Sequence, residues 1–313
     1  MKVLFTGASS FTGFWFVQAL VEAGHEVVAV FRRSREDSTD SVRRERIERL
    51  EPVCRPIWGV PFGTPAFLDV IDSETGWDLL CHHAAEVADY RSDEFDVAGA
   101  LVSNIRSAPA ILDRLKTRGC RGVVLTGSVF EAGEGAGSEG VPAVSPYGLS
   151  KFLTAEAFRF YLEQKSLPMG KFVVPNPFGP YEEQRFTAYL MGKWFSRETA
   201  TVRTPDYVRD NIHVSLLARA YVRFVERLAG SGGNNLKLNP SGYVESQGEF
   251  AQRVAREVRV RTGLSCALEL ERQLEFPEPL VRVNTDSLEP SELGWNERSA
   301  WDELTSYYQA RLG

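Results

Sequence analysis

The sequence lacks the features of several protein classes. Its four cysteines lie far apart with no C-x-x-C pair, which argues against a metal site and predicts reduced thiols. Its net charge of -6 provides no positive surface for nucleic acid or an anionic membrane. No apolar run approaches the roughly 20 residues that a membrane helix requires. The opening MKVLFTG enters a strand pattern directly, without a signal peptide. We therefore expect a cytoplasmic protein with no nucleic-acid or membrane partner.

What the sequence does contain is an alternation of strand and helix signals over its first two-thirds. Apolar runs predict strands at 2–5, 26–31, 78–83, 122–128 and 171–176, with a weak one near CRPIWGV. Helical periodicity predicts helices at 11–23, through a charged stretch ending at Glu48, at 95–119 and at 147–164. This alternation predicts an α/β fold with a Rossmann-type, doubly wound parallel sheet.

The alternation ends near residue 180. Beyond it, proline, glycine and charge are scattered, and 212–228 is the clearest helical segment. We therefore predict two domains. Residues 1–176, with about 209–228, would form the Rossmann domain, and residues 177–208 and 229–313 a smaller, discontinuous C-terminal lobe.

The stretch LFTGASSFTG lies between the first strand and the first helix. Gly7 and Gly13 occupy the outer positions of a G-x-x-G-x-x-G pattern, and Ser10 replaces its middle glycine. The N–H groups and dipole of a helix N-terminus attract a pyrophosphate at this position. Ser10 fits there if its φ is negative, and its hydroxyl could then donate a bond. The alternative is an ordinary tight turn between a strand and a helix.

The stretch SPYGLSK provides candidates for catalysis. Tyr147 and Lys151 are four residues apart on a predicted helix and so share one face. An ammonium group beside a phenol favours the phenolate, as a general acid–base requires. Ser128 ends a predicted strand, where parallel strands present side chains to a ligand.

These features, in this order, resemble the extended short-chain dehydrogenase/reductase superfamily, and within it the NAD(P)-dependent nucleotide-sugar epimerase/dehydratase family. The resemblance covers nearly the whole chain. Its motifs are TGASSFTG, HHAA at 82–85, Asn104, PNPFGP at 175–180 without the preceding arginine of the family motif, RDNIHVSLLARA at 209–220 without its acidic residue, and LGW at 293–295.

The resemblance implies roles for particular residues. Tyr147 would be the acid–base, Lys151 would lower its pKa and hold the nicotinamide ribose, and Ser128 would bind the reacting oxygen. The implied cofactor contacts are Gly7, Ser9, Ser10, Phe11, Thr12, Gly13, Arg32, Arg33, Ser34, Ala84, Ala85, Asn104, Tyr147, Lys151 and Pro175. The implied substrate contacts are Val87, Ser128, Asn176, Arg185 and Arg209, with Asn176 and Arg209 on the diphosphate. Two alternatives stay open, a structural role for Asn104 and a salt bridge from Arg209 to Asp210 or Glu226.

The end of the second strand bears on the choice of cofactor. Phe31 stands where an acid would bond the ribose of NAD, and Arg32, Arg33 and Ser34 follow. This resembles the R-R-S of GDP-mannose 4,6-dehydratases, which use NADP. We therefore predict NADP rather than NAD; the alternative is a solvated basic turn.

The residues after Ser128 bear on the reaction. Dehydratases of this family have an acid pair there, whereas this chain has Val129 and Phe130, with Glu131 one step too late unless the loop is shifted. We therefore predict a nucleotide-sugar 4-ketoreductase, with an epimerase holding NAD(P) tightly as the alternative and a non-catalytic NADP sensor as a third hypothesis. In relatives, helices four and five commonly build the four-helix bundle of a dimer, so the resemblance also implies a homodimer.

Overall fold

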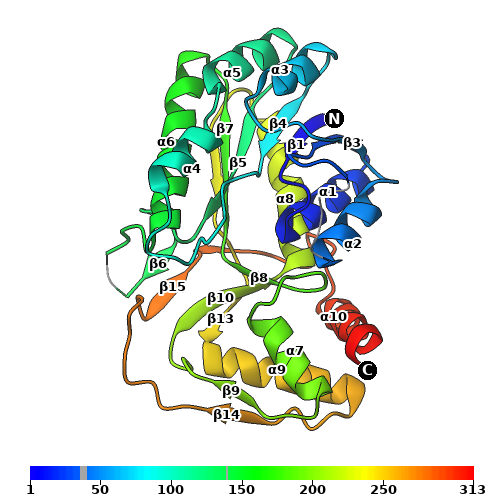
Figure 1. Cartoon of the computed structure of the whole chain (residues 1–313), viewed down its shortest axis with the longest axis vertical. Coiled ribbons are helices and arrows are strands. Elements are labelled where there is room, and N and C mark those ends of the chain that lie inside the picture. The colour runs from blue at the N-terminus through cyan, green and yellow to red at the C-terminus, as the bar shows by residue number, and fades with distance from the viewer. Residues whose placement is uncertain (36–40, 139) are drawn as a thin grey trace. The chain divides into compact units, whose positions relative to one another are not determined.

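A computed structural model describes residues 1–35, 41–138 and 140–313 of the protein. The chain forms two compact units (Figure 1). The first unit contains residues 1–134, 141–174 and 218–239, and the second contains 135–140, 175–217 and 240–313. The predicted division differs from this one chiefly in two places, because residues 209–217 fold with the second unit and residues 229–239 with the first.

The first unit is built on a parallel sheet. Within the described residues this sheet has seven strands, in the order β11-β7-β5-β4-β1-β2-β3. The strands are β1 Lys2–Thr6, β2 Glu26–Val30, β3 Arg55–Ile57, β4 Leu79–His82, β5 Val123–Ser128, β7 Met169–Val174 and β11 Leu236–Leu238. The predicted doubly wound α/β fold is confirmed. The strand order reverses between β1 and β4, and ligands bind at the carboxyl ends of the strands beside such a reversal.

Helices cover both faces of this sheet (Figure 1). They are α1 Phe11–Glu22, α2 Ser41–Leu50, α3 Pro65–Asp72, α4 Val97–Asn104, α5 Ala108–Thr117, α6 Pro146–Gln164 and α8 Val214–Ala229. On one face, Ile111 and Leu112 of α5 and Phe158 of α6 join a buried apolar cluster with the sheet. On the other face, the ring of Phe16 stacks on that of Tyr221 with centroids 4.0 Å apart. Both faces bury apolar surface, which explains why the strands read as continuous apolar runs.

Two local predictions in this unit need correction, and one helix was not predicted. The single helix predicted at 95–119 is wrong, because α4 and α5 are separated at 105–107, where Ser107 has a φ of 54°. The strand predicted at 171–176 stops at Val174, and the chain then enters the second unit. Helix α3 was not predicted, although Thr64 caps it and Pro65 begins it. Residues 36–40 of the predicted charged helix lie outside the described part of the chain.

The second unit combines short strands with three helices that periodicity did not reveal. One sheet has the order β13-β10-β15-β6, with β8 paired to β10, and two further strand pairs are β12–β16 and β14–β9. The strands are β6 Ala136–Gly137, β8 Asn176–Phe178, β9 Ala200–Val202, β10 Val208–His213, β12 Pro240–Ser241, β13 Tyr243–Ser246, β14 Leu268–Leu270, β15 Val281–Val283 and β16 Asp286–Ser287. The helices are α7 Phe186–Phe195, α9 Gln247–Thr262 and α10 Glu297–Leu312, and they pack around Trp194, Phe250 and Trp301.

Two searches of the described residues bear on function. Among those residues, no helix is long and apolar enough to cross a membrane. The same residues contain no group of three or more histidine, cysteine, aspartate or glutamate side chains arranged to hold a metal ion.

Candidate active site

The loop after β1 approaches the segment after β4 so closely that side chains are excluded. Gly7 has a φ of +82°, and a Cβ there would lie 2.7 Å from the backbone nitrogen of Ala84. A Cβ on Gly13 would lie 2.2 Å from the Gly7 carbonyl oxygen. Both glycines are therefore required by close backbone contacts, and the loop leads into the N-terminus of α1, as a dinucleotide phosphate requires.

Ser10 takes the place of the middle glycine without strain. Its φ is −73°, as expected from the sequence, and it caps α1 by accepting a bond from the Gly13 N–H at 3.1 Å. Its hydroxyl donates to the Gly7 carbonyl at 2.9 Å and lies 2.9 Å from Nε2 of His83. The hydroxyl therefore holds the loop in shape through protein partners.

Two further side chains, those of His83 and Arg46, hold the loop in place. His83 Nδ1 lies 2.9 Å from Thr126 Oγ1 on β5, so its ring links the loop to the middle of the sheet. Burial, with a contribution from the Lys151 charge, lowers the pKa of His83 to about 3, and the ring is neutral at physiological pH. The fully buried Arg46 of α2 donates to the carbonyl of Ser9 at 3.0 Å. Sequence reasoning treated Arg46 only as part of a basic stretch.

The basic residues after β2 lie at the surface. Arg32 and Arg33 are exposed, and Ser34 is half-buried. Arg32 forms an ion pair with Glu86 at 3.0 Å. Glu86 also accepts from the backbone N–H groups of Val87 and Ala88, so this pair ties the end of β2 to the segment after β4.

The hydrogen bonds of Asn104 fit the alternative in which this residue has a purely structural role. It is buried, its amide donates to Thr154 Oγ1 at 3.2 Å, and its carbonyl accepts from the Glu86 N–H at 2.9 Å. Its backbone carbonyl bonds His82 Nε2 at 3.1 Å. Asn104 therefore fastens α4 to α6 and to the segment after β4.

Ser128 is the last residue of β5 and is almost completely buried. Its Oγ accepts from the Phe130 N–H at 3.3 Å, an acceptor role that keeps the hydroxyl proton available for a ligand oxygen. Its own N–H donates to Glu131 Oε1 at 2.8 Å. The loop after β5 therefore holds this serine from both sides.

Helix α6 begins directly against that loop. Ser145 caps it and Pro146 starts it, so the helix origin is set locally. A Cβ on Gly148 would lie 2.1 Å from the Phe130 carbonyl oxygen, so glycine allows the helix and the loop to touch. This contact brings Tyr147 beside the loop that holds Ser128.

Three aromatic rings surround Tyr147. The ring centroids of Tyr90, Phe95 and Phe130 lie 5.7, 6.0 and 6.4 Å from that of Tyr147, all edge-on. Tyr147 is half-buried. The rings therefore orient the phenol while part of it stays accessible.

Lys151 lies one helical turn after Tyr147 and is buried. Its Nζ donates to the Thr126 carbonyl on β5 at 2.5 Å. Burial lowers the pKa of Lys151, the nearby Glu131 raises it, and the Lys171 charge lowers it again. The structure thus brings Ser128, Tyr147 and Lys151 to the end of β5 and the adjoining face of α6.

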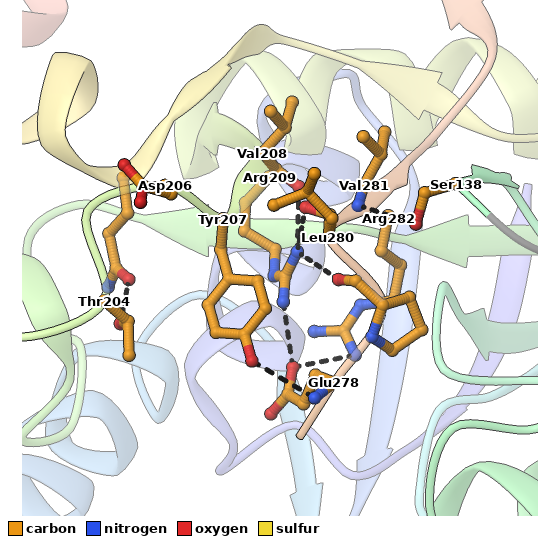
Figure 2. Close-up of polar contacts among 12 residues, drawn as sticks. Ser138, Thr204, Asp206, Tyr207, Val208, Arg209, Glu278, Leu280, Val281 and Arg282 are labelled. Atoms are coloured by element: carbon orange, nitrogen blue, oxygen red, sulfur yellow. Dashed lines mark hydrogen bonds and ion pairs between the residues drawn. The ribbon is translucent and has the colours of Figure 1, made fainter. Parts of the chain in front are cut away.

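In the second unit, Arg209 has a partner that the sequence did not reveal. Arg209 on β10 and Arg282 on β15 are register partners in neighbouring parallel strands (Figure 2). Their guanidinium groups lie 3.0 and 3.4 Å from the same carboxylate oxygen of Glu278. The Arg209 guanidinium also stacks 4.3 Å from the Tyr207 ring centroid. The only sequence signal for Arg282 was the short alternating run VRV at 281–283.

The carboxylate expected to pair with Arg209 was Asp210 or Glu226, and the structure shows Glu278 instead. Asp210 follows Arg209 on the strand and points to the other face. It is buried and accepts from the N–H groups of Gly242 at 2.8 Å and Asn284 at 3.1 Å. Asp210 therefore has a structural role. The Arg209 guanidinium donates from one nitrogen to the backbone carbonyls of Val208, Pro279 and Leu280 and from the other to Glu278.

The remaining predicted contact residues are distributed over both units. In the first unit, Ala84 and Ala85 are half-buried and Val87 is exposed. In the second unit, Pro175 is buried, Asn176 begins β8, and Arg185 precedes α7 with its guanidinium 3.8 Å from Glu183.

Comparison with known proteins identifies relatives of the whole chain. Residues 3–237 match the model of the NAD dependent epimerase/dehydratase family. The chain is 26% identical to a UDP-glucose 4-epimerase of Streptomyces lividans, with 96% of this chain and 92% of that protein covered. It is also 26% identical to a UDP-glucose 4-epimerase of Mycolicibacterium smegmatis, with 97% and 96% covered.

Solved structures share the fold. A UDP-glucuronic acid 4-epimerase variant from Bacillus cereus, in complex with a fluorinated UDP-sugar and NAD, superposes with a TM-score of 0.74 at 17% identity. That match covers 99% of this chain and all of the other.

Proposed function

The chain belongs to the NAD dependent epimerase/dehydratase family, and from this premise we propose that it is an epimerase of nucleoside-diphosphate sugars that works with tightly bound NAD. The observation that carries the proposal is the placement of Ser128, Tyr147 and Lys151 at the end of β5 and on α6. UDP-sugars are the first candidates for the substrate, because both curated relatives are UDP-glucose 4-epimerases.

The residues after β1 fit a dinucleotide cofactor. The backbone contacts at Gly7 and Gly13 leave no room for a Cβ, and the loop opens on the N-terminus of α1. The residues that would hold the cofactor are those of this loop, with Ala84, Tyr147 and Lys151. A bound nicotinamide supplies a hydride acceptor that can return the hydride to either face of a keto-sugar.

The protein residues move the proton. Tyr147 would take the proton from a sugar hydroxyl and later return it to the same oxygen, the general acid–base role of a positioned phenol. Lys151 would stabilise the phenolate with its positive charge. Ser128 would donate a hydrogen bond to the reacting oxygen, where negative charge develops.

In the second unit, Arg209 and Arg282 would bind the diphosphate. Arginine suits this role because its planar guanidinium makes paired bonds to phosphate oxygens. Burial and the Arg209 charge lower the pKa of Arg282 to about 10, and it is still cationic at neutral pH. Two adjacent cations that share one carboxylate carry excess positive charge, which a diphosphate would neutralise.

The residues argue against dehydration. Val129 and Phe130 cannot transfer protons. Glu131 is buried, accepts a hydrogen bond from the Ser128 N–H and forms an ion pair with Lys171. The second candidate, a 4-ketoreductase that uses NADPH, is favoured by the exposed Arg32 and Arg33, which could accept a 2′-phosphate.

A direct experiment separates these functions. The purified protein is analysed by mass spectrometry for its bound cofactor and is then incubated with UDP-glucose or UDP-glucuronic acid, without added nicotinamide. An epimerase converts these sugars to their 4-epimers with no net change in nicotinamide absorbance. Consumption of added NADPH with a 4-keto-sugar, and no epimer, would establish the reductase instead.

We also propose that the protein is a homodimer through α4 and α6. Val102 on α4 and Phe160 on α6 are 68% and 56% exposed, and these two helices pack together. Such exposed apolar side chains on packed helices suit a helical interface. Sedimentation of wild type and of Phe160→Glu tests this, and a monomeric wild type would contradict it.

A further inference from the structure

Beneath Ser128 lies a buried ion pair that the proposed chemistry does not use. Lys171 of β7 and Glu131 are 5% and 1% exposed, and Lys171 Nζ lies 2.6 Å from Glu131 Oε2. Lys171 also contacts Glu134 at 2.7 Å. Burial opposes the charge of Lys171, but the two carboxylates more than compensate and raise its pKa. Burying two charges is costly, so such a pair calls for an explanation.

We propose that the Glu131–Lys171 pair is a positioning device for the proposed reaction: Glu131 fixes Ser128 through its main-chain N–H and supplies the negative charge that Lys151 faces. The inference rests on the proposed function for its catalytic consequence. The contact between Glu131 and Ser128, and the shared surroundings of Glu131 and Lys151, stand independently of it.

The space for the pair is created by a glycine. A Cβ on Gly127 would lie 3.0 Å from Lys171 Cε and 3.1 Å from Glu131 Oε1. It would also lie 3.3 Å from Val173 Cγ2, as expected because Lys171 and Val173 share one face of β7. Val173 occupies the position of the arginine that the PNPFGP motif lacks. Lys171, two residues earlier, therefore places a cation on the same face of that strand.

The pair acts on Ser128 through the backbone. One Glu131 oxygen accepts the Ser128 N–H at 2.8 Å, and the other is held by Lys171 at 2.6 Å. The Glu131 N–H in turn bonds the Ser128 carbonyl at 3.0 Å. A carboxylate held at both oxygens fixes the turn that presents the Ser128 hydroxyl.

The pair acts on Lys151 through charge. Glu131, Lys151 and Lys171 line one cavity of about 10 Å³. The titratable groups around Lys151 are Glu131, Lys171, Tyr147 one turn earlier on α6, and the neutral His82 and His83 of the β4 segment. The negative charge of Glu131 favours the ammonium of Lys151, and the positive charge of Lys171 opposes it.

Opposite pH shifts in two variants test the device. Glu131→Gln leaves the positive charge of Lys171 near Lys151, so Lys151 should lose its proton at lower pH. The alkaline limb of the pH profile of kcat should then shift to lower pH. Lys171→Met removes that like charge, so the alkaline limb should shift to higher pH. Simple damage to the fold would not move the two limbs in opposite directions. In Glu131→Gln, kcat should fall about 10- to 100-fold while KM stays within about threefold, because Ser128 is displaced and diphosphate binding is untouched.

Glu134→Gln is the matched control. The carboxylate of Glu134 bonds Lys171, Lys237 and Asn239, at 2.6 to 3.0 Å. The variant therefore changes a second buried carboxylate on the same lysine without touching Ser128. Its kcat and alkaline limb should match wild type. Equal effects of Glu131→Gln and Glu134→Gln, or limbs that do not separate, would overturn the inference.

A second measurement keeps the test independent of turnover. The rate at which acetic anhydride labels Lys151, followed by peptide mass spectrometry across pH, reports its protonation directly. Its midpoint should fall in Glu131→Gln and rise in Lys171→Met. If wild type converts no nucleotide sugar but these midpoints shift as expected, the proposed function fails and the charge coupling stands. If turnover is present and the midpoints do not move, the positioning device is wrong.

Discussion

The two units each hold cationic side chains against a carboxylate, but in different surroundings. In the first unit, the side chains of Glu131 and Lys171 are 0% and 6% exposed. In the second, Arg209 is similarly enclosed at 10%, but its partner Glu278 is 48% exposed. When both side chains of an ion pair are buried, no ligand can replace either of them. When the carboxylate is exposed, an anionic ligand can take its place beside the cation.

The free energy contributed by an ion pair also depends on whether the pair is buried or exposed. Removing one partner of a buried pair costs about 3–5 kcal/mol, because the other charge is left in a medium of low polarity. An exposed pair contributes about 0–1 kcal/mol. Glu278 should therefore be displaced at a lower cost than Glu131. Under the proposed function, the first unit would fix the reacting groups and the second would bind and release the diphosphate.

The sharpest test of this difference is Tyr147→Phe in the first unit. Loss of the phenolic proton should reduce kcat about 10²- to 10⁴-fold, the usual effect of a positioned acid–base. Affinity for UDP, measured by calorimetry, should stay within a few-fold of wild type, because Arg209 and Arg282 are unchanged. Wild-type turnover in this variant would show that α6 is only structural.

Arg209→Ala in the second unit should give the converse result. Losing a paired ionic contact of about 1.5–3 kcal/mol should raise KM for the nucleotide sugar about 10- to 100-fold. Cofactor binding, followed by fluorescence, should hardly change. Arg209→Lys, which keeps the charge and loses the planar fork, should lie between the two. A variant that lost the cofactor and kept its KM would contradict the assignment.

Glu278→Gln should have a smaller effect of the opposite sign. Without the Glu278 carboxylate the two arginines lose an anion that they share, so UDP should bind about 3- to 10-fold more tightly, in line with the contribution of a half-exposed pair. Glu275→Gln, an exposed neighbour on the same segment, is the control. Unchanged affinity would show that Glu278 does not compete with the ligand.

The smallest expected effect concerns Arg32 and Glu86, an exposed ion pair of the first unit. Arg32 is 57% exposed, so a 2′-phosphate could take the place of Glu86. Glu86→Gln should improve binding of NADPH relative to NADH by about threefold or less, as a surface pair allows. Wild-type affinities for the two cofactors test the predicted NADP preference itself, and a preference for NADH would contradict it.

Sequence reasoning worked well in the first unit because its signals are local. Strands buried on both faces read as apolar runs, and the loop at Gly7 and the Y-x-x-x-K spacing are short motifs. It failed where distant segments meet. The break between α4 and α5 falls at Ser107, whose hydroxyl donates to the carbonyl of the distant Gly63, and the pairing of Arg282 with Arg209 depends on strand register. Neither is visible in one window of sequence.

The second unit was harder for a physical reason. Helices α9 and α10 are capped clearly, α9 by the capping box of Ser246 and Glu249 and α10 by Asn296, but their many charged residues hide the apolar period. Glu131 shows the same limit. Its sequence position, one step too late for the acid pair of the dehydratases, indicated no role for it, and only the fold shows that Lys171, forty residues later, binds its carboxylate.

The space at Gly127 has an evolutionary consequence. A methyl group there would lie 3.0 Å from Lys171 Cε and 3.1 Å from Glu131 Oε1, so alanine at 127 would require both side chains to shift by a few tenths of an ångström. We therefore expect the three residues to be epistatic, with a change that is harmful alone becoming neutral after another. Among descendants of this chain we expect positions 127, 131 and 171 to vary together or not at all.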